Sequence, residues 1–298
     1  MPDRLRGRAR LLPARRRSAD GAPPDASCGY AVRGARRALV LGGGGLVGLA
    51  WHAGALKALE DRDIDVASSD LVVGTSAGAI VAAYLAAGWG QGDLYEYMHG
   101  RHPLAQEDEA TDAAAIAAIF FRDLPEMWPR DGLYVCTVES GTKNRVVFGA
   151  PGAPKASLPL AVLASCALPD RFPAVEIDGT GYSDGGAYSA TSVDVAVDAG
   201  CDSILCLTPQ GYLLDGSRIT SPALRWQMLS RYPFVRRLRK EVHYARNKGI
   251  ETRVLRPHVA DLLHIGRDLM RPFDRAHMAD LARAGVTRTL EASELKEV

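Results

Sequence analysis

The stretch from residue 71 to residue 88 constrains the fold of this chain more than any other. A short apolar run at residues 71–73 leads through a glycine-containing turn into residues 77–87, which are apolar on nearly every side. Such a helix is expected to be buried rather than amphipathic. An apolar run at residues 38–41, followed by helical spacing over residues 49–60, repeats this order. Alternating short strands and helices predict parallel strands in an α/β fold.

The alternation continues after residue 88 towards the end of the chain. Residues 178–180, Asp-Gly-Thr, separate two short runs and predict a hairpin. We find no internal repeat and no linker strong enough to divide residues 36–298, so we expect a single domain there. Further strands are expected at residues 133–137, 145–148, 175–177, 181–183, 203–207 and 252–255, and further helices at residues 91–98, 112–121, 160–166, 193–199, 234–247 and 261 to about 284.

The first 35 residues differ in composition from the rest. They are rich in arginine, proline, alanine and glycine with little periodicity, and residues 1–35 are therefore predicted to form a disordered basic tail. This tail lacks the apolar face that an interfacial membrane helix needs. Over all 298 residues the formal net charge is only +1. That balance argues against nucleic acid as the main partner, because phosphate-binding surfaces usually show a strong basic excess.

Cysteine usage and hydropathy favour a cytoplasmic protein. The five cysteines form no Cys-x-x-Cys pair and are odd in number, which is typical of reduced thiols rather than of a disulfide framework or a zinc site. No run of about 18 apolar residues exists, so no transmembrane helix is predicted, and prolines interrupt any signal peptide. Transient contact with a membrane surface stays open. The basic run at residues 236–240 is more typical of a solvated helix face than of contact with anionic lipid.

The turn at residues 74–78 reads Gly-Thr-Ser-Ala-Gly and fits the pattern Gly-x-Ser-x-Gly. A nucleophile on a sharp strand-to-helix turn projects its hydroxyl away from the backbone, and the crowding there tolerates only small neighbours two residues away. Residues 181–185 fit the same pattern around Ser183, but no helix is expected to start there. We therefore predict that Ser76 is a catalytic nucleophile that hydrolyses ester bonds, in preference to a simple helix N-cap.

A run of glycines at residues 42–45 lies between the first strand and the first helix. Such a backbone can bring N–H groups close to an anion. Residues 43–48 also fit the dinucleotide pattern Gly-x-Gly-x-x-Gly, with Asp63 or Asp65 at about the spacing of a ribose-binding acid. That acid should end the second strand, whereas both of these acids precede it. An oxyanion hole is therefore the better interpretation of the glycines.

Three motifs taken together resemble the patatin-like phospholipase family. Asp-Gly alone is usually only a turn, so Asp184 gains its meaning from the two motifs before it. The resemblance covers about residues 37–285. It rests on the glycine turn at residues 43–48, the serine turn at residues 74–78, the sequence Asp184-Gly185-Gly186, and the stretches 164–169 and 172–173 before that aspartate.

The resemblance implies a three-layer α/β/α fold with a mainly parallel central sheet. It also implies lipid acyl hydrolase activity with no metal and no organic cofactor. Residue by residue, it makes Ser76 the nucleophile and Asp184 its partner in a Ser–Asp dyad. The backbone around Gly43, Gly44 and Gly45 becomes the oxyanion hole. The other motif positions are Gly48, Gly74, Gly78, Gly185 and Gly186.

The residues themselves agree with this chemistry. Ser76 Oγ would pass its proton to Asp184 and attack an ester carbonyl, and water would then cleave the acyl-enzyme. A carboxylate is a weak base for a serine hydroxyl, so Asp184 needs a dry setting that raises its pKa. Val47 stands where many members of the family carry a basic residue, but backbone donors should supply most of the stabilisation. The expected partner is a lipid or fatty-acyl ester, and the sequence does not determine the oligomeric state.

Three other functions stay open at this point. His258 and His264 follow Asp184, so the Ser–Asp–His order of α/β-hydrolases is met, although the glycines of that fold normally lie farther ahead of the nucleophile. An acyltransferase would use Ser76 with an acceptor other than water. A non-catalytic module would bind a dinucleotide at the glycine turn. Each histidine of the chain is more typical of a surface or packing residue than of a catalytic one.

Overall fold

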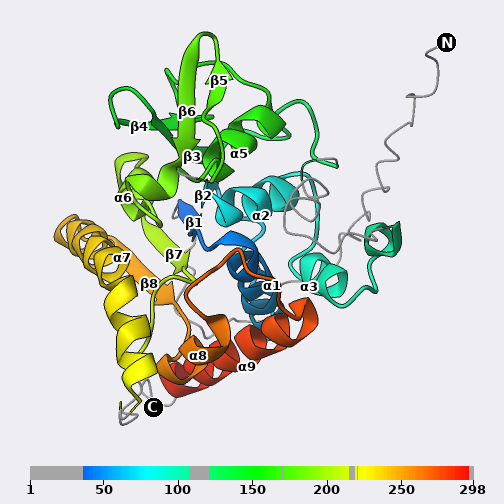
Figure 1. The fold of residues 1–298 in the computed structure, drawn as a ribbon. Helices are drawn as coiled ribbons and strands as arrows, with labels where there is room; N and C mark the ends of the chain where they lie inside the picture. Colours follow the sequence, from blue (N-terminus) through cyan, green and yellow to red (C-terminus); the bar gives the residue numbers. More distant parts are fainter. Residues whose placement is uncertain are drawn as a thin grey trace, which may run out of the picture.

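Within the part of the chain that the structure describes, eight strands form one mixed sheet (Figure 1). This computed structural model describes residues 36–107, 121, 123–169, 171–214, 219 and 221–294. Strands β3, β2, β1, β7 and β8 are parallel neighbours in that order, while β4 and β6 run antiparallel to β3, and β5 antiparallel to β6. The strands are β1 (Arg37–Leu41), β2 (Leu71–Thr75), β3 (Leu133–Glu139), β4 (Arg145–Phe148), β5 (Val175–Ile177), β6 (Thr180–Asp184), β7 (Ser203–Leu207) and β8 (Glu251–Leu255).

Helices cover both faces of this sheet and give three layers. Helices α1, α2 and α5 pack on one face, with α3 and α9 against α1, while α6 and α7 pack on the other face. The helices are α1 (Gly45–Glu60), α2 (Ala77–Ala86), α3 (Asp93–Met98), α5 (Leu158–Cys166), α6 (Val193–Asp198), α7 (Pro222–Asn247), α8 (Leu262–Ile265) and α9 (Arg275–Glu294), and the 3-10 turns are η1 (Pro103–Glu107), η2 (Gly185–Ala187) and η3 (Val259–Asp261).

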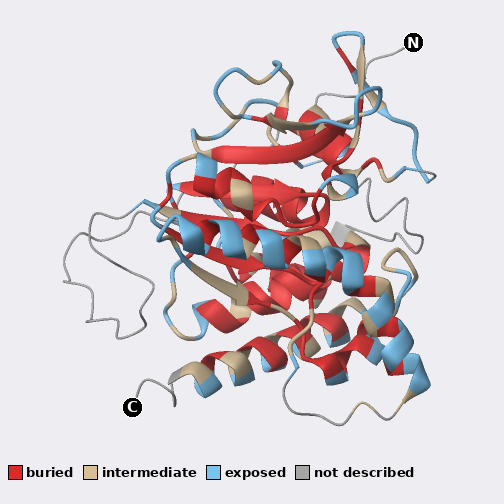
Figure 2. Cartoon of the chain, turned by 90° about the vertical axis from the view of Figure 1, so that its left-hand side faces the viewer, coloured by how far each residue is buried: buried red, intermediate tan, exposed pale blue. Residues whose placement is uncertain are grey.

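Each central strand contributes side chains to two cores. Successive side chains of a strand point to opposite faces, so Leu39 and Leu41 join the core under α1 and α2, and Ala38 and Val40 join the core under α6 and α7. A strand buried on both faces must be apolar throughout, as β1 and β2 are. Figure 2, seen from the side of α6 and α7, shows the buried strands behind the outer helix layer.

The turns that follow β1, β2 and β7 meet at one edge of the sheet, because the three strands are parallel neighbours. The glycine turn follows β1, Ser76 follows β2, and Pro209 with Gln210 follow β7. From β1 the chain continues to β2, which pairs with one side of β1, whereas β7 pairs with the other side. Open α/β sheets bind their ligands at such a switch point, outside the carboxyl ends of the strands.

The expected α/β fold with a mainly parallel sheet is confirmed. The predicted hairpin is present too, because Ile177 pairs with Thr180 across β5 and β6. Asp178 and Gly179 between them have φ angles of 49° and 76°, the conformation that a two-residue hairpin turn requires. Helix α1 begins at Gly45, four residues before the expected start, because the last glycine of the turn already forms its first residue.

The prediction of one helix from residue 261 onward is wrong. Helix α8 ends at Ile265, and α9 begins only at Arg275. Gly266 stops α8 with a φ of 74°, and Pro272 has no N–H for a helical hydrogen bond. Asp274 Oδ1 then accepts the His277 N–H at 3.0 Å and starts α9. The intervening loop crosses in front of the start of α1 (Figure 1).

Helix α7 is longer than expected at its start. It begins at Pro222 rather than at residue 234, because Ser221 caps it and the helix continues through Pro233. Of the predicted helix at residues 112–121 only residue 121 is described, and the predicted tail lies outside the described residues. None of the helices in the described part combines the length and the hydropathy that a bilayer span needs.

Candidate active site

Ser76 lies in a strained turn between β2 and α2. Its φ of 53° and ψ of −123° are rare for a residue with a side chain. Such a conformation costs roughly 1–3 kcal/mol and persists only where the surrounding structure holds it. The residue is 6% exposed, at the carboxyl edge of the sheet. This is the sharp strand-to-helix turn that presents a serine hydroxyl in serine hydrolases.

The two glycines of the serine turn are required by close packing. A Cβ on Gly78 would overlap the carbonyl oxygen of Leu41, because α2 starts directly against the end of β1. A Cβ on Gly74 would lie 2.5 Å from Ala79 Cα, because the helix folds back over the strand. Side chains at either position would push α2 away from the sheet, so both glycines are needed for the turn.

Three consecutive residues at the end of α5 hold both predicted catalytic residues. The Ser76 N–H donates to Ser165 Oγ at 2.8 Å, and the Ser165 hydroxyl donates to a carbonyl of β3 at 2.6 Å. The Asp184 N–H donates to Ala167 O at 2.9 Å. Cys166 lies between these two anchors, and its thiol interacts with the Ser76 hydroxyl. The sequence pattern contains these residues, but nothing in it indicates these roles.

Asp184 ends β6 and is almost fully buried. Its Oδ1 accepts the Gly186 N–H at 2.7 Å. Burial raises the pKa of the carboxyl to about 6, against the opposing effects of the Ser76 hydroxyl and the Gly186 N–H. Oδ2 has no partner of standard hydrogen-bond geometry among the described residues, so the contact with Ser76 is looser than a standard bond. Catalytic hydrogen bonds are often long before substrate binds.

Cys166 is the other nucleophilic side chain beside Ser76. Burial and the neighbouring Asp184 carboxylate raise the pKa of its thiol well above the usual value, and the Ser76 hydroxyl offsets this only in part. The thiolate, not the thiol, is the reactive form of cysteine. Cys166 therefore stays protonated at neutral pH and does not compete with Ser76 as the nucleophile.

The glycine turn runs beside the serine turn. A Cβ on Gly43 would lie 3.4 Å from Ser76 Cβ. The Gly43 N–H donates to Ala190 O at 2.8 Å, so this N–H is already engaged. The Gly44 and Gly45 N–H groups make no hydrogen bond to the described residues, and both lie at the start of α1, where N–H groups attract anions. Of the three glycines predicted for the oxyanion hole, only Gly44 and Gly45 thus keep N–H groups without a hydrogen-bond partner among the described residues.

Two neighbours fix the shape of the glycine turn. His52 is fully buried in α1, and its Nε2 lies 2.7 Å from Gly42 O. Burial lowers the pKa of His52 to about 4, although this hydrogen bond opposes the shift, so the ring is neutral and donates to the carbonyl. On the other side the Val47 N–H donates to Leu269 O at 3.1 Å. Val47 itself is buried in the core and presents no charge.

The histidines proposed for a triad contact other elements. His258 Nε2 lies 3.1 Å from Gly285 O and 3.0 Å from Thr289 Oγ1, both in α9. His264 is exposed and its ring packs near that of His277. No hydrogen bond joins a histidine to Ser76 or Asp184 among the described residues, so the arrangement supports a dyad over a triad.

The acids proposed for a dinucleotide site lie at the wrong edge of the sheet. Asp63 and Asp65 precede β2, at its amino end, whereas the glycine turn follows β1 at the carboxyl end. Because β1 and β2 are parallel, these ends are opposite edges. In the described part of the chain, no group of three or more His, Cys, Asp or Glu side chains is arranged to hold a metal ion.

Comparison with known proteins agrees with this geometry. The sequence profile of the family described as patatin-like phospholipase matches residues 39–101 and 113–197, which include both turns and Asp184. Similar solved structures include VipD from Legionella pneumophila (14% identity, TM-score 0.48, 86% of this chain and 67% of that chain), the type III effector ExoU (20%, 0.39, 88% and 54%) and a complex of SpcU with ExoU from Pseudomonas aeruginosa (16%, 0.38, 86% and 52%). The chain thus spans only about half the length of the ExoU chains. By the profile match and the site that it contains, the chain belongs to the patatin-like phospholipase family.

Proposed function

We propose that this chain is a serine lipid acyl hydrolase that works through Ser76 and Asp184. The observation that carries the proposal is a strained serine turn beside a buried carboxyl group whose pKa is raised to about 6. A carboxylate with that pKa is a better base than an ordinary one, and it is still ionised at neutral pH. Membership of the family implies lipid acyl hydrolase activity.

The acylation step forms one bond and breaks another. Ser76 Oγ attacks the ester carbonyl while its proton moves to Asp184 Oδ2, the carboxylate oxygen that accepts no hydrogen bond of standard geometry from the described residues. The tetrahedral intermediate then collapses, and the leaving alcohol takes the proton from Asp184. Water repeats the sequence with Asp184 as base, which releases the fatty acid and restores Ser76.

The negative charge that develops on the carbonyl oxygen needs donors close to Ser76. We assign this role to the free N–H groups of Gly44 and Gly45, together with the N–H of Ala77 at the start of α2. Two helix starts, α1 and α2, converge on this point and add their positive ends. Losing one such donor elsewhere costs about 3 kcal/mol in the transition state, so backbone alone can support turnover without a basic residue at Val47.

Transient contact with a lipid surface belongs to the same proposal. Helix α7 exposes three large side chains, Trp226, Leu229 and Tyr232, each more than half exposed. Aromatic side chains of this kind favour the membrane interface. The basic run on the same helix contributes less than its sequence indicates, because Arg237 pairs with Glu241 at 3.0 Å and stacks on a tyrosine ring.

The test is lipid and ester profiling of the full chain beside Ser76→Ala. We expect wild type to release fatty acid from lipid esters and Ser76→Ala to lose at least about a thousandfold of that activity. Product analysis separates hydrolysis from acyl transfer, because transfer would leave the acyl group on an alcohol acceptor instead of releasing it. A folded Ser76→Ala protein that retains most of its activity would refute the assignment.

A further inference from the structure

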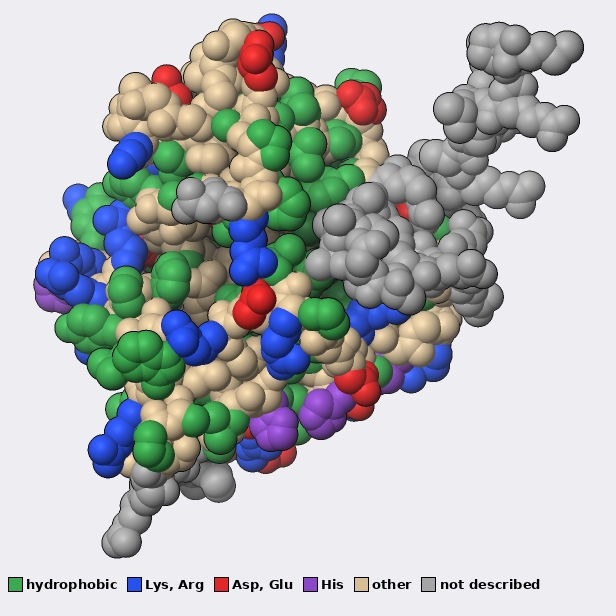
Figure 3. Space-filling model, in the orientation of Figure 1, with side chains coloured by type: hydrophobic (Ala, Val, Ile, Leu, Met, Phe, Trp, Pro, Cys, Tyr) green, Lys and Arg blue, Asp and Glu red, His purple; other side chains and the backbone are tan. Residues whose placement is uncertain are grey.

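A hollow of about 440 Å³ lies beside the glycine turn. We call it the arginine hollow, because its wall includes three arginines. Figure 3 shows basic side chains gathered around an acidic one near the middle of this face. A volume of this size suits a small polar group or head group. The residues that matter here are Arg171, Gln210, Arg231, Arg267, Asp268 and Leu269.

The arginine hollow is joined to the serine turn by three segments. The position of a Cβ on Gly43 lies 3.4 Å from Ser76 Cβ and 3.6 Å from Gln210 Nε2, so serine and glutamine flank the same glycine. Leu269 O accepts the Val47 N–H in the same turn. Arg171 follows closely after α5, whose last residues hold Ser76. A substrate bound at Ser76 can therefore reach into the hollow.

Arg231 is a buried cation without an acid. It is only 5% exposed, and its two terminal nitrogens donate to Gln227 Oε1 at 2.6 Å and to Gly266 O at 2.7 Å. No carboxylate pairs with it among the described residues, and its Nε has no partner. Burial lowers the pKa of Arg231 to about 10, so it is still charged at neutral pH. A buried unpaired charge is costly and calls for an anionic partner.

The remaining charges of the hollow leave it positive. Asp268 is the one carboxylate on its wall, and it is already engaged by Arg171 at 3.3 Å and by the Met270 N–H. Arg267 is exposed, and its guanidinium stacks over Trp226 at 5.2 Å rather than on an acid. Gln210 adds an unpartnered Oε1. Among the described residues, Arg231 and Arg267 thus have no carboxylate partner, and the wall contains one acid.

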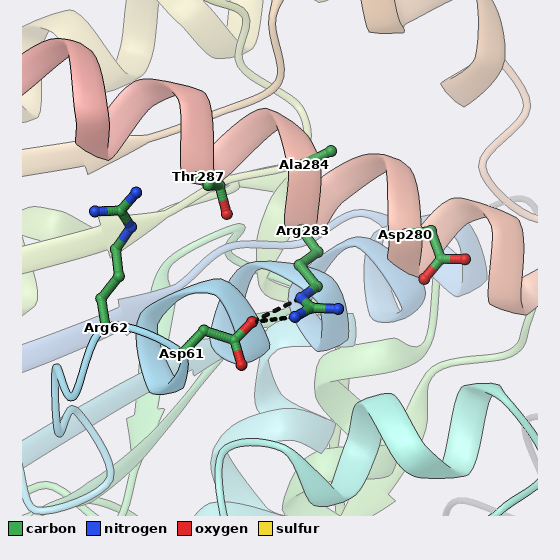
Figure 4. A pocket seen from close by; sticks show the side chains of 6 residues that line it. All are labelled: Asp61, Arg62, Asp280, Arg283, Ala284 and Thr287. Carbon is green, nitrogen blue, oxygen red and sulfur yellow. Dashed lines mark hydrogen bonds and ion pairs between the residues drawn. The ribbon is translucent and has the colours of Figure 1, made fainter.

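A second hollow shows what a balanced charge cluster looks like in this protein. It lies between the end of α1 and α9, roughly 24 Å of helix away from the glycine turn. Arg283 Nε donates to Asp61 there at 2.7 Å (Figure 4). Arg62 pairs with Glu291 at 2.9 Å. Each of these arginines has its acid, so nothing in that hollow calls for a ligand.

We infer that the arginine hollow binds the phosphate group of a phospholipid substrate while its acyl ester lies at Ser76. Guanidinium groups suit phosphate because their N–H donors match its oxygens in pairs. The glycine turn has no charged side chain of its own, and these arginines lie in the wall of the hollow beside it. The inference rests on the proposed function and adds the residues that would hold the phosphate group during the reaction at Ser76.

The experiment measures binding in the full chain that carries Ser76→Ala, so turnover does not interfere. Dihexanoylphosphatidylglycerol, kept below its critical micelle concentration, is titrated by calorimetry beside dihexanoylglycerol, which has the same chains without phosphate. We expect Arg231→Gln to weaken binding of the phospholipid about 10- to 100-fold, the scale of a charge-assisted hydrogen bond, and Arg267→Gln to weaken it less. Arg246→Gln, an exposed arginine of α7 outside both the hollow and the basic run, is the matched control and should bind like the parent.

Each outcome decides the inference. Circular dichroism checks the folding of Arg231→Gln, and the exposed Arg267→Gln tests the hollow independently. Unchanged binding in both variants, or equal affinity for dihexanoylglycerol, overturns the inference. Binding of inorganic phosphate without binding of the phospholipid would show that the hollow takes free phosphate and not a lipid head group, which also overturns the inference. With Ser76 restored, the ratio of kcat/KM on the phospholipid to that on p-nitrophenyl butyrate should fall in Arg267→Gln. Absence of any turnover would refute the proposed function, while the binding result would still stand.

Discussion

The segments at residues 74–78 and 181–185 share the pattern Gly-x-Ser-x-Gly but not the backbone that carries it. Ser76 has a φ of 53° between a strand and a helix. Ser183 lies inside β6, where it pairs with Val138 of β3, and its Oγ is 3.5 Å from Val138 O. A hydroxyl held in a regular strand lacks the converging helix starts that surround Ser76. The backbone, and not the pattern, separates the two serines.

The second segment is nevertheless part of the site through the residue after its serine. Successive side chains of a strand point to opposite faces, so Asp184 turns towards Ser76 while Ser183 turns away. Gly185 is required because a Cβ there would overlap Cys136 O. The glycines of the two segments are thus required for different reasons. In the first segment they let α2 pack closely against the sheet, and in the second a glycine lets the Asp184 carboxylate approach Ser76.

The largest expected difference between the segments is in chemical labelling. A fluorophosphonate probe should modify Ser76 and leave Ser183 unmodified, because only Ser76 lies beside a base and free N–H donors. Peptide mapping by mass spectrometry identifies the adduct. Ser183→Ala should label like wild type, whereas Ser76→Ala should not label at all. An adduct on Ser183 in the wild-type protein would reverse the assignment of the two serines.

The next prediction tests the aspartate of the second segment. Asp184→Asn should lower kcat/KM on a soluble ester by about a thousandfold or more, because the two members of a dyad act as one unit. Asparagine keeps the acceptor for the Gly186 N–H but cannot take the proton from Ser76. His258→Ala and His264→Ala should cost little, since His258 is bonded to α9 and His264 is exposed.

A histidine variant that stays folded and loses about a thousandfold would instead indicate a triad. Circular dichroism provides the folding control for each variant. Ser183→Ala is the matched neighbour of Asp184→Asn in the same strand, and its kcat/KM should remain within about twofold of wild type, the range of a surface change.

The parallel core was predictable because its local signals agree. Strands such as β1 and β2 are continuous apolar runs that end in glycine, and the hairpin turn at Asp178 and Gly179 has the required residues. The break between α8 and α9 was not predicted, because the sequence has helical spacing both before and after Gly266. The start of α7 was not predicted, because a proline such as Pro233 usually indicates a helix boundary. In the structure, tertiary packing keeps the chain helical on both sides of Pro233.

The candidate site was predictable where a short sequence pattern reflects a turn that only certain residues can form. Ser76, Asp184 and the glycines were predicted this way, and in the structure they lie close together. The hydrogen bonds of Ser165 and His52 were not, because they join residues far apart in the chain or a helix to a turn. Arg231 gave no signal either, since an arginine inside a helix is usually exposed. Only its burial without an acid distinguishes it.

The smallest predicted effect is the pH dependence of kcat/KM, which distinguishes Asp184 from its neighbour Ser183 in β6. With a pKa of about 6 for Asp184, kcat/KM should rise about tenfold from pH 5 to pH 7 and then level off, because only the ionised carboxylate accepts the serine proton. Ser183→Ala should show the same profile. A rate that stays flat down to pH 4.5 would show that the carboxyl ionises at its ordinary value.

Stability should respond to the same group with the opposite sign. The pKa of Asp184 is higher in the folded protein than in the unfolded chain, so the folded protein keeps a proton over a range where the unfolded chain has lost it. The free energy of unfolding should therefore fall as pH rises from about 4 to about 6, and this contribution should be constant above that range. A shift of about two pKa units corresponds to roughly 3 kcal/mol.

Asp184→Asn has no charge to bury, so it should be more stable than wild type at pH 8 although it is inactive. Ser183→Ala should not be more stable than wild type. Denaturant unfolding at pH 4.5 and pH 8 measures both, and a destabilised Asp184→Asn at pH 8 would contradict the burial of an ionised carboxylate at this site.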